Sequence, residues 1–508
     1  MMRTAATWLA LASIDVLGLL PWGRFRFPLS DFAEMVYEIR RLELGFIPYR
    51  DTVTHHFLGY VVPLFAAGSI VELTPLVLKI VTVGFHVTTA VFVWLTLREL
   101  GRPRDAWLGA FLAVTLGWFW SWQGFGFNVQ SLLSPLIAAV LFFVTRACAR
   151  SSARPFYLAA LAAGILLTWD PRTLVVLPLI SIPIAFVPSL RRGRVISVAM
   201  ALLLLAPACG ALYLLRAGAW SDFVEQTIVY PLTYRNHGVS FDVVAWLKTG
   251  LGTWLGGERI AVPLMLGSLI AVLRWEARTW WKAVCVVSVA GSAIYAALGG
   301  RPYPNYFMVF APITLVLMSL LPVYASARWP DIGRAVTAGL ICVGVFCAIR
   351  PVLLWRQTGS VFLAPDETTI EAAASYLRSQ TESHDKVLVW GYAPSIYVLS
   401  DRFRTFRDEG LLSVAGANFA SSAAADQALV PHMVEEFDAF LAKDSPKAIV
   451  VYNVTREPCP GKGIIQRNFD YERNPGLANL REILASIYHS ALVINGRCDR
   501  AEVFVLGR

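Results

Sequence analysis

The stretch SDFAEMVYEIRRLELGFIPYRDTVTHHFLGY follows the first apolar segment of the chain and holds the residues best suited to chemistry. Its first acid, Asp31, is expected beside the bilayer, where a carboxylate suits a general base that takes a proton from a hydroxyl group. Asp31 followed by Glu34 also has the spacing of a capping box, in which the aspartate only caps a helix. The spacing leaves both interpretations open.

A short helix is predicted to carry Asp31. Its apolar positions, at helical spacing, are Phe32, Val36, Ile39 and Leu42. Its charged positions, on other faces, are Glu34, Glu38, Arg41 and Glu43. This pattern is typical of an amphipathic helix that lies on the outer membrane surface. Gly45 is expected to end it.

The composition indicates a membrane protein with a soluble part. The chain has 508 residues, of which 56% are hydrophobic and 16% charged, against about 25% charged in soluble domains. We predict a polytopic α-helical membrane domain over residues 1–355 and a small soluble α/β domain over residues 356–508. The net charge of +9 does not indicate nucleic-acid binding, because the arginines lie mostly in short loops between apolar runs.

The apolar runs predict about eleven transmembrane helices, since a span needs roughly 20 mainly apolar residues. The predicted spans lie near 5–22, 76–97, 107–122, 129–147, 157–169, 173–188, 195–215, 260–273, 281–298, 306–324 and 335–350. The segment Phe57–Val71 is apolar but short. If it crossed the membrane, the arginine clusters of the later loops would face outward, against the positive-inside rule. We therefore predict an interfacial or re-entrant helix there.

This assignment fixes the orientation: the N-terminus is cytoplasmic and the C-terminal domain extracytoplasmic. The outward loops are then 23–75, 123–128, the turn around 170, 216–259 and 299–305. In the outer domain, strands are expected at Lys386–Trp390 and Ala448–Tyr452, and a closing hairpin at Ala491–Ile494 and Glu502–Leu506. Helices are expected at Glu367–Ser379, Glu435–Ala442 and Asn479–Tyr488.

Three stretches carry a family resemblance. In the first loop, an acid precedes an amphipathic helix and a G-x-x-P-Y-R-D stretch; the matching residues are Asp31, Tyr37, Gly45, Pro48, Tyr49, Arg50, Asp51 and the pair His55–His56. The others are Gly300–Phe307 (GRPYPNYF) and Val387–Asp401. Together with the span layout, they resemble the GT-C superfamily of membrane glycosyltransferases. The likeness is strongest to the branch of protein O-mannosyltransferases and the lipid A aminoarabinose transferase, in its bacterial members.

The resemblance implies an inverting glycosyltransferase of the cytoplasmic (inner) membrane. It would move a sugar from a polyprenyl-phosphate donor to a hydroxyl of an envelope acceptor, which is a glycolipid, a polysaccharide or a protein. Asp31 would remove the proton of that hydroxyl at the outer face. No cofactor is expected beyond the lipid-linked donor, in agreement with the absence of a glycine-rich nucleotide-binding motif from the sequence.

Negative charge grows on the lipid phosphate as it leaves, so cations at the outer surface should stabilise it. The candidate phosphate ligands are His55, His56, Arg301, Arg172 and Arg50. A structural interpretation stays open for each of them. The histidines could bind water or backbone, Arg301 could snorkel to the interface, and the other arginines could pair with neighbouring aspartates.

The candidate sugar-binding residues are Tyr49, Asn128, Gln130, Asp170, Tyr303 and Asn305. Asn128 and Gln130 could equally cap the span that follows them. Members of the superfamily often carry a second acid in the next outward loop, whereas residues 123–130 contain no carboxylate. We therefore expect no metal.

Two other classes of protein remain open. A transporter or flippase for a lipid-linked saccharide would explain the spans and the basic residues, but transporters often show internal repeats, and the sequence shows none. A non-catalytic envelope scaffold that binds a partner through residues 357–508 would be indifferent to the loss of Asp31. An enzyme that uses a diphosphate-linked donor is barely separated from the main hypothesis by sequence.

Overall fold

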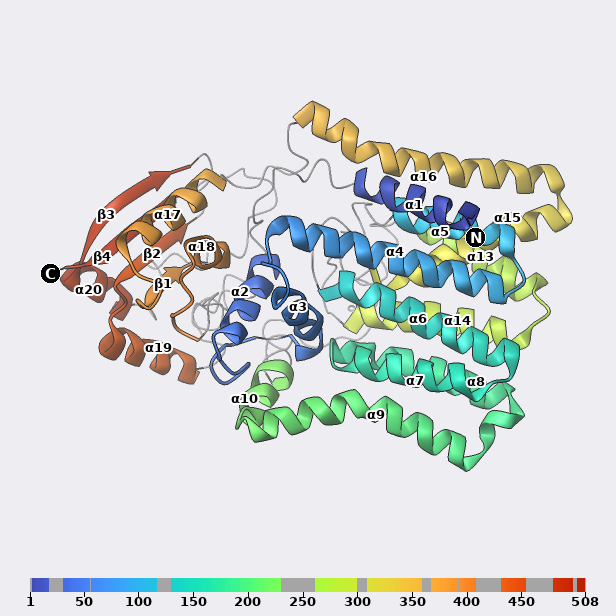
Figure 1. The fold of residues 1–508 in the computed structure, drawn as a ribbon, viewed down its shortest axis with the longest axis horizontal. Helices are drawn as coiled ribbons and strands as arrows, with labels where there is room; N and C mark the ends of the chain where they lie inside the picture. Colours follow the sequence, from blue (N-terminus) through green and yellow to red (C-terminus); the bar gives the residue numbers. More distant parts are fainter. Residues whose placement is uncertain are drawn as a thin grey trace.

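The computed structural model describes residues 2–17, 31–54, 56–116, 129–229, 261–298, 308–358, 367–391, 393–407, 431–453, 478–496 and 500–507. A bundle of long, roughly aligned helices lies beside a smaller α/β unit, and the chain ends in that unit (Figure 1). The mostly helical fold with an added α/β unit agrees with the predicted fold class.

Each segment predicted to span the membrane lies along a helix. The helices are α1 (Met2–Leu17), α4 (Pro75–Glu99), α5 (Pro103–Leu116), α6 (Val129–Arg150), α7 (Ala153–Leu167), α8 (Leu177–Phe186), α9 (Gly193–Arg216), α13 (Ala261–Trp275), α14 (Thr279–Leu298), α15 (Ala311–Arg328) and α16 (Pro330–Thr358). Within the described residues, the segments long and apolar enough to cross a membrane are Ile80–Glu99, Leu133–Arg150, Gly193–Arg216, Met308–Arg328 and Pro330–Ile349. The protein is thus an integral membrane protein, and the count of about eleven spans stays a prediction.

The segment Phe57–Val71 forms a 3₁₀ turn, η2 (Leu58–Tyr60), and a short helix, α3 (Val61–Gly68). The eight residues of α3 extend about 12 Å, against an apolar membrane thickness of about 30 Å. A helix of this length is too short to cross the membrane alone, and the interfacial or re-entrant position stays a prediction.

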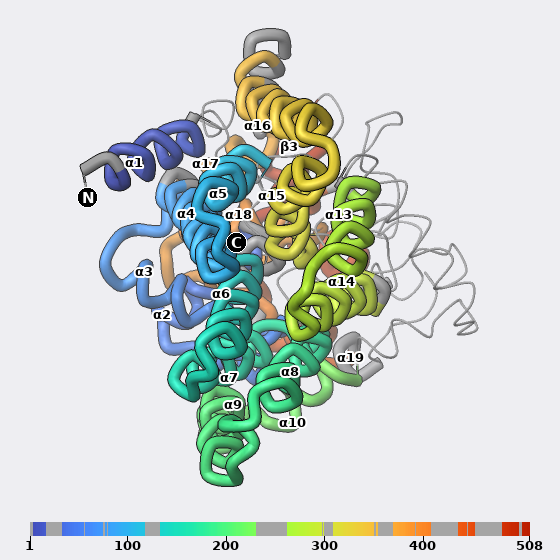
Figure 2. The backbone as a smooth tube through the Cα atoms, turned by 90° about the vertical axis from the view of Figure 1, so that its right-hand side faces the viewer, coloured from blue at the N-terminus to red at the C-terminus, as the bar shows by residue number. Residues whose placement is uncertain are grey.

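Burial separates the centre of the bundle from its edges. Helix α15 is apolar all round and its span is 89% buried, as expected for a central helix. The spans of α9 and α16 are only 11% and 22% buried, and the two helices lie at opposite edges in Figure 2. Helix α9 packs closely on α7, because a Cβ at Gly164 would lie 2.2 Å from the carbonyl oxygen of Leu203.

The α/β unit contains one sheet in the order β1-β2-β4-β3. Its strands are β1 (Val387–Trp390), β2 (Ala448–Asn453), β3 (Tyr488–Asn495) and β4 (Arg500–Leu506). Strand β1 is parallel to β2, and β4 is antiparallel to β2 and β3. The flanking helices are α17 (Glu367–Gln380), α18 (Pro394–Ser400), α19 (Pro431–Asp444) and α20 (Ala478–Ile487). The predicted strands, helices and hairpin are all present, while the domain boundary at residue 355 stays a prediction.

The predicted amphipathic helix is α2 (Asp31–Glu43), and Gly45 follows it with the positive φ of +88° that suits a helix end. The side chains from Ala33 to Ile39 are all buried, so other parts of the protein cover this helix, and its position on the outer membrane surface stays a prediction. Val36 belongs to the core of the bundle, whereas Tyr37 belongs to the core of the α/β unit. Helix α2 lies between the helical bundle and the α/β unit (Figure 1).

Candidate functional site

The loop after α2 is closed by a tight turn. The Asp51 carboxylate accepts a hydrogen bond from the Ile47 N–H at 2.7 Å and pairs with Arg50 at 2.9 Å. The Arg50 guanidinium beside Asp51 holds the pKa of that carboxyl below its usual range. Arg50 also donates to the Ala217 carbonyl at 3.3 Å. The local ion pair left open by the sequence is therefore present, and Arg50 also contacts the segment that follows α9.

The segment after α9 holds the loop after α2 in place. It begins with α10 (Trp220–Val224) and a π-helical turn, η6 (Glu225–Val229). The Gln226 side chain donates to the Tyr49 carbonyl at 2.7 Å and accepts from the Thr54 N–H at 3.0 Å. Tyr49 is fully buried in a left-handed conformation (φ +67°), and its hydroxyl donates to the His56 carbonyl at 2.8 Å. The backbone positions of His56 and Tyr49 are thus held by hydrogen bonds.

The loop after α2 is also joined to the turn after α7. The Gly59 N–H donates to the Thr168 carbonyl at 2.7 Å. Two residues further, Asp170 accepts hydrogen bonds from the Arg172 side chain at 2.6 and 3.0 Å and from the Tyr295 hydroxyl at 2.6 Å. The Arg172 guanidinium lies 4.6 Å from the centre of the Tyr295 ring. A partly exposed cation is thereby held rigidly where three chain segments meet.

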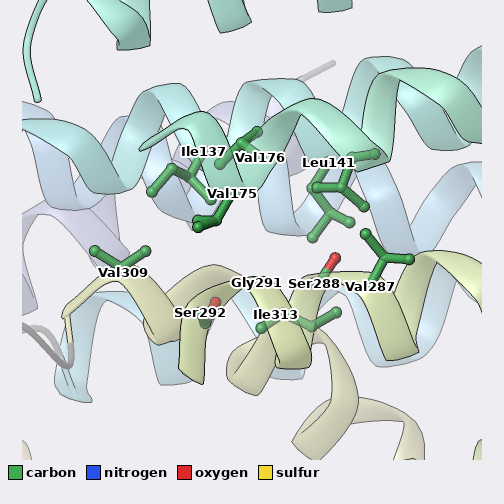
Figure 3. A pocket seen from close by; sticks show the side chains of 11 residues that line it. Ile137, Leu141, Val175, Val176, Val287, Ser288, Gly291, Ser292, Val309 and Ile313 are labelled. Carbon is green, nitrogen blue, oxygen red and sulfur yellow. The ribbon is translucent and has the colours of Figure 1, made fainter. Parts of the chain in front are cut away.

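An apolar cleft begins next to this cluster and runs between the membrane helices (Figure 3). Val175 and Val176 of the 3₁₀ turn η4 (Pro171–Val176) line one side, and Gly291 and Ser292 of α14 line the other. A Cβ at Gly291 would lie 2.8 Å from the Val175 carbonyl oxygen, so glycine is required for this close approach. The cleft is small, about 20 Å³, which is room for about one water molecule; its lining is apolar, and it does not hold an apolar chain as it stands.

Some of the predicted site residues, or their side chains, lie outside the part of the chain that the structure describes. Asp31 is the first residue of α2 and Gln130 lies in the first turn of α6, but their side chains are outside the described part. His55, Asn128, Arg301, Tyr303 and Asn305 lie outside the described residues altogether. The structure brings Tyr49, Arg50 and His56 together on one loop and pairs Asp170 with Arg172 on the next. Their roles toward donor and acceptor stay predictions.

Nothing in the sequence singles out Gln226 or Tyr295, because their partners lie more than a hundred residues away along the chain. Within the described part of the chain, no group of three or more His, Cys, Asp or Glu residues could hold a metal ion. The expectation of no metal stays an expectation.

Glu38 is a buried acid, which the sequence pattern assigned only to the charged face of helix α2. Its carboxylate accepts a hydrogen bond from the Tyr60 hydroxyl and is 5% exposed. Burial raises the pKa of Glu38 to about 7, and hydrogen bonds from Thr54 and Tyr60 oppose part of that rise. Glu38 therefore changes its charge near neutral pH, on the same helix as Asp31.

The raised pKa of Glu38 predicts a pH-dependent stability. Between about pH 4.5 and 7 the folded protein holds a proton that the unfolded chain has lost, so the free energy of unfolding should fall as the pH rises. Glu38→Gln should remove this fall and stabilise the protein at pH 8 by an amount on the order of 1–3 kcal/mol. Thermal unfolding in detergent from pH 5 to 8 measures this difference. Glu72→Gln, at a side chain that is 75% exposed, serves as the control and should follow the wild type; a wild-type profile for Glu38→Gln would contradict the prediction.

Comparison with known proteins identifies the class of fold. No protein-family model and no curated protein matches the chain. Among solved structures, the likeness is to the GT-C fold of membrane glycosyltransferases, which confirms the fold expected from the first loop. Because the sequence identities are below 25%, this likeness concerns the fold.

Two proteins represent this fold. ArnT from Cupriavidus metallidurans bound to undecaprenyl phosphate matches with a TM-score of 0.61 at 11% identity, over 99% of this chain and 98% of ArnT. Its apo state matches with a TM-score of 0.58 over the same shares. The Archaeoglobus fulgidus oligosaccharyltransferase, in complex with Zn and sulfate, matches with a TM-score of 0.50 at 14% identity, over 88% of this chain and 67% of that chain.

Proposed function

We propose that the protein is an inverting glycosyltransferase that moves a sugar from a polyprenyl-phosphate donor to a hydroxyl of an envelope acceptor. The reaction takes place at the outer face of the cytoplasmic membrane, with the N-terminus in the cytoplasm. The observation that carries the proposal is the end-to-end likeness to ArnT bound to undecaprenyl phosphate. The match covers 99% of this chain, its bundle and its α/β unit together, and 98% of ArnT, whereas a match to the bundle alone would leave the α/β unit out.

Asp31 is the general base of the proposed reaction. The acceptor oxygen attacks C1 of the sugar from the face opposite the donor phosphate, its proton passes to the Asp31 carboxylate, and the C1–O bond to the phosphate breaks. Attack from the opposite face inverts the configuration at C1. The position of Asp31 as the first residue of α2 supports this role, since α2 is enclosed by both bodies of the protein and so has a fixed place.

Arg172 is the described residue best placed to bind the leaving phosphate. Asp170 and Tyr295 orient its guanidinium, and a side-chain exposure of 21% leaves part of it accessible. An oriented cation stabilises growing negative charge without reorganising during the reaction. His56 and Arg50 would approach the phosphate from the first loop.

Donor choice tests the proposal. Purified protein in lipid nanodiscs is given a polyprenyl-phosphate sugar, the matching polyprenyl-diphosphate sugar or a nucleotide sugar, together with envelope glycolipid acceptors. We expect free polyprenyl phosphate and a glycosylated acceptor from the first donor alone. Transfer from the diphosphate donor alone would overturn the donor assignment. Movement of an intact lipid-linked sugar across the bilayer, with no bond broken, would favour a flippase instead.

A further inference from the structure

Tyr37 is a residue of the first loop whose side chain lies inside the C-terminal domain. It is fully buried, and its ring centre lies 5.2 Å from that of Tyr397 and 5.8 Å from that of Phe403. It shares one apolar core with residues of α17 and of the sheet, such as Ile370 and Val389. The C-terminal domain therefore packs directly around a side chain of α2.

Arg41, one helical turn after Tyr37, strengthens this contact. Its guanidinium donates to the Tyr37 hydroxyl at 2.9 Å, to the Asp51 carbonyl at 2.5 Å and to the Phe406 carbonyl at 3.5 Å. Arg41 is only 2% exposed, and a buried charge is tolerated when such hydrogen bonds satisfy it. Loss of the C-terminal domain would remove one of these acceptors and expose the others to water.

Arg407 joins the same domain to two outward loops. Its backbone carbonyl accepts from the Val53 N–H at 2.7 Å. Its guanidinium pairs with Asp222 of α10 at 3.0 Å and with Glu436 of α19 at 2.8 Å. The domain thus contacts α2 through Tyr37 and Arg41, the loop after α2 through Val53, and the segment after α9 through Asp222.

Helix α2 depends on these contacts. It has 13 residues, and isolated helices shorter than about 12–15 residues are marginal in water, so packing must fix it. Its other face, at Val36 and Ile39, belongs to the core of the bundle. One face alone would leave the helix free to tilt, whereas two opposed faces fix its position and its axial rotation.

We propose that the C-terminal domain positions α2 for catalysis and that Tyr37 is the positioning residue through which it does so. The proposal rests on the proposed glycosyltransferase function, with Asp31 as the first residue of the same helix. Tyr37 touches no reacting group. It sets where the general base lies, and a shift of about 1 Å in such a group lowers the rate roughly 10²-fold.

The test replaces Tyr37 by alanine and, separately, by phenylalanine. Tyr37→Ala should lower kcat about 10²-fold. The donor KM should stay within about 3-fold of wild type, because the residues proposed to bind the donor phosphate lie outside the core that contains Tyr37. Tyr37→Phe keeps the ring in the core and loses only the hydrogen bond from Arg41, so it should retain most of kcat. Hydrogen exchange of the α2 amides gives a second readout, which should speed up in Tyr37→Ala and stay near wild type in Tyr37→Phe.

Tyr488→Ala is the matched control. Tyr488 belongs to the core on the opposite face of the same sheet, where its hydroxyl donates to the Pro446 carbonyl at 2.5 Å. This variant should lower the stability of the domain and keep kcat and the α2 exchange near wild type. The proposal is overturned if Tyr37→Ala keeps wild-type kcat and exchange, or if Tyr488→Ala loses as much as Tyr37→Ala. A wild type that transfers no sugar would sink the proposed function, while the exchange readout would still decide whether the domain fixes α2.

Discussion

Asp31→Asn is expected to lower sugar transfer from a polyprenyl-phosphate donor by about two or more orders of magnitude, the loss typical of a removed general base. Asparagine has nearly the same size and caps helices as well as aspartate does. Helix α2 should therefore keep its place between the bundle and the C-terminal domain. The measurement compares initial rates at matched protein levels, together with thermal unfolding to show that both proteins are folded.

Glu43→Gln is the control at the other end of the same helix. Glu43 pairs with Arg40 at the surface, at 2.8 Å, so its loss should leave the rate near wild type. Equal activity of the wild type and Asp31→Asn would make Asp31 a helix cap only and require another base. A loss of folding in Asp31→Asn together with the loss of rate would point to the same structural role.

Gly59→Ala should damage the contact between the loop after α2 and the turn after α7. A Cβ at this position would lie 2.0 Å from the Trp169 ring and 2.7 Å from the Thr168 backbone carbon. The backbone cannot yield as a flexible side chain does, so the hydrogen bond from Gly59 to Thr168 should be lost. We expect a destabilisation of about 1–3 kcal/mol and a fall in transfer of about 10²-fold, because the first loop shifts against the Arg172 cluster. Thermal unfolding and initial rates measure the two effects.

Gly84→Ala provides the comparison for Gly59→Ala. Gly84 lies within α4, and a Cβ there meets no atom within 4 Å. Alanine favours a helix by up to about 1 kcal/mol over glycine, so this variant should be as stable as the wild type or more so. Equal stability and activity of Gly59→Ala and the wild type would show that the two loops are not held together at this point.

The sequence by itself determined the elements and the fold class. Where the structure describes them, the apolar runs predicted to span are mostly helical, since a segment in lipid must satisfy its backbone hydrogen bonds internally. The strands at Val387–Trp390 and Ala448–Asn453 correspond to short apolar runs, which are typical of buried strands. The spacing of apolar residues likewise predicted α2, and Gly45 predicted its end.

The ion pairs within one loop were also within reach of the sequence. Arg50 with Asp51 and Arg172 with Asp170 are one or two residues apart, so the chain brings them together whatever the rest of the fold does. They were named as an open alternative to phosphate binding, and the structure shows the pairs. A role of either arginine toward the donor stays a prediction.

Only the tertiary structure decided what covers the polar face of α2. Amphipathic spacing reports that one face is apolar, and it says nothing of the partner that the opposite face meets. Tyr37 meets Tyr397, and Gln226 meets Tyr49, across separations of more than a hundred residues along the chain. Such contacts depend on how whole helices and a sheet pack, and local periodicity carries no information about that packing. The burial of Glu38, and with it the pKa of about 7, was decided in the same way.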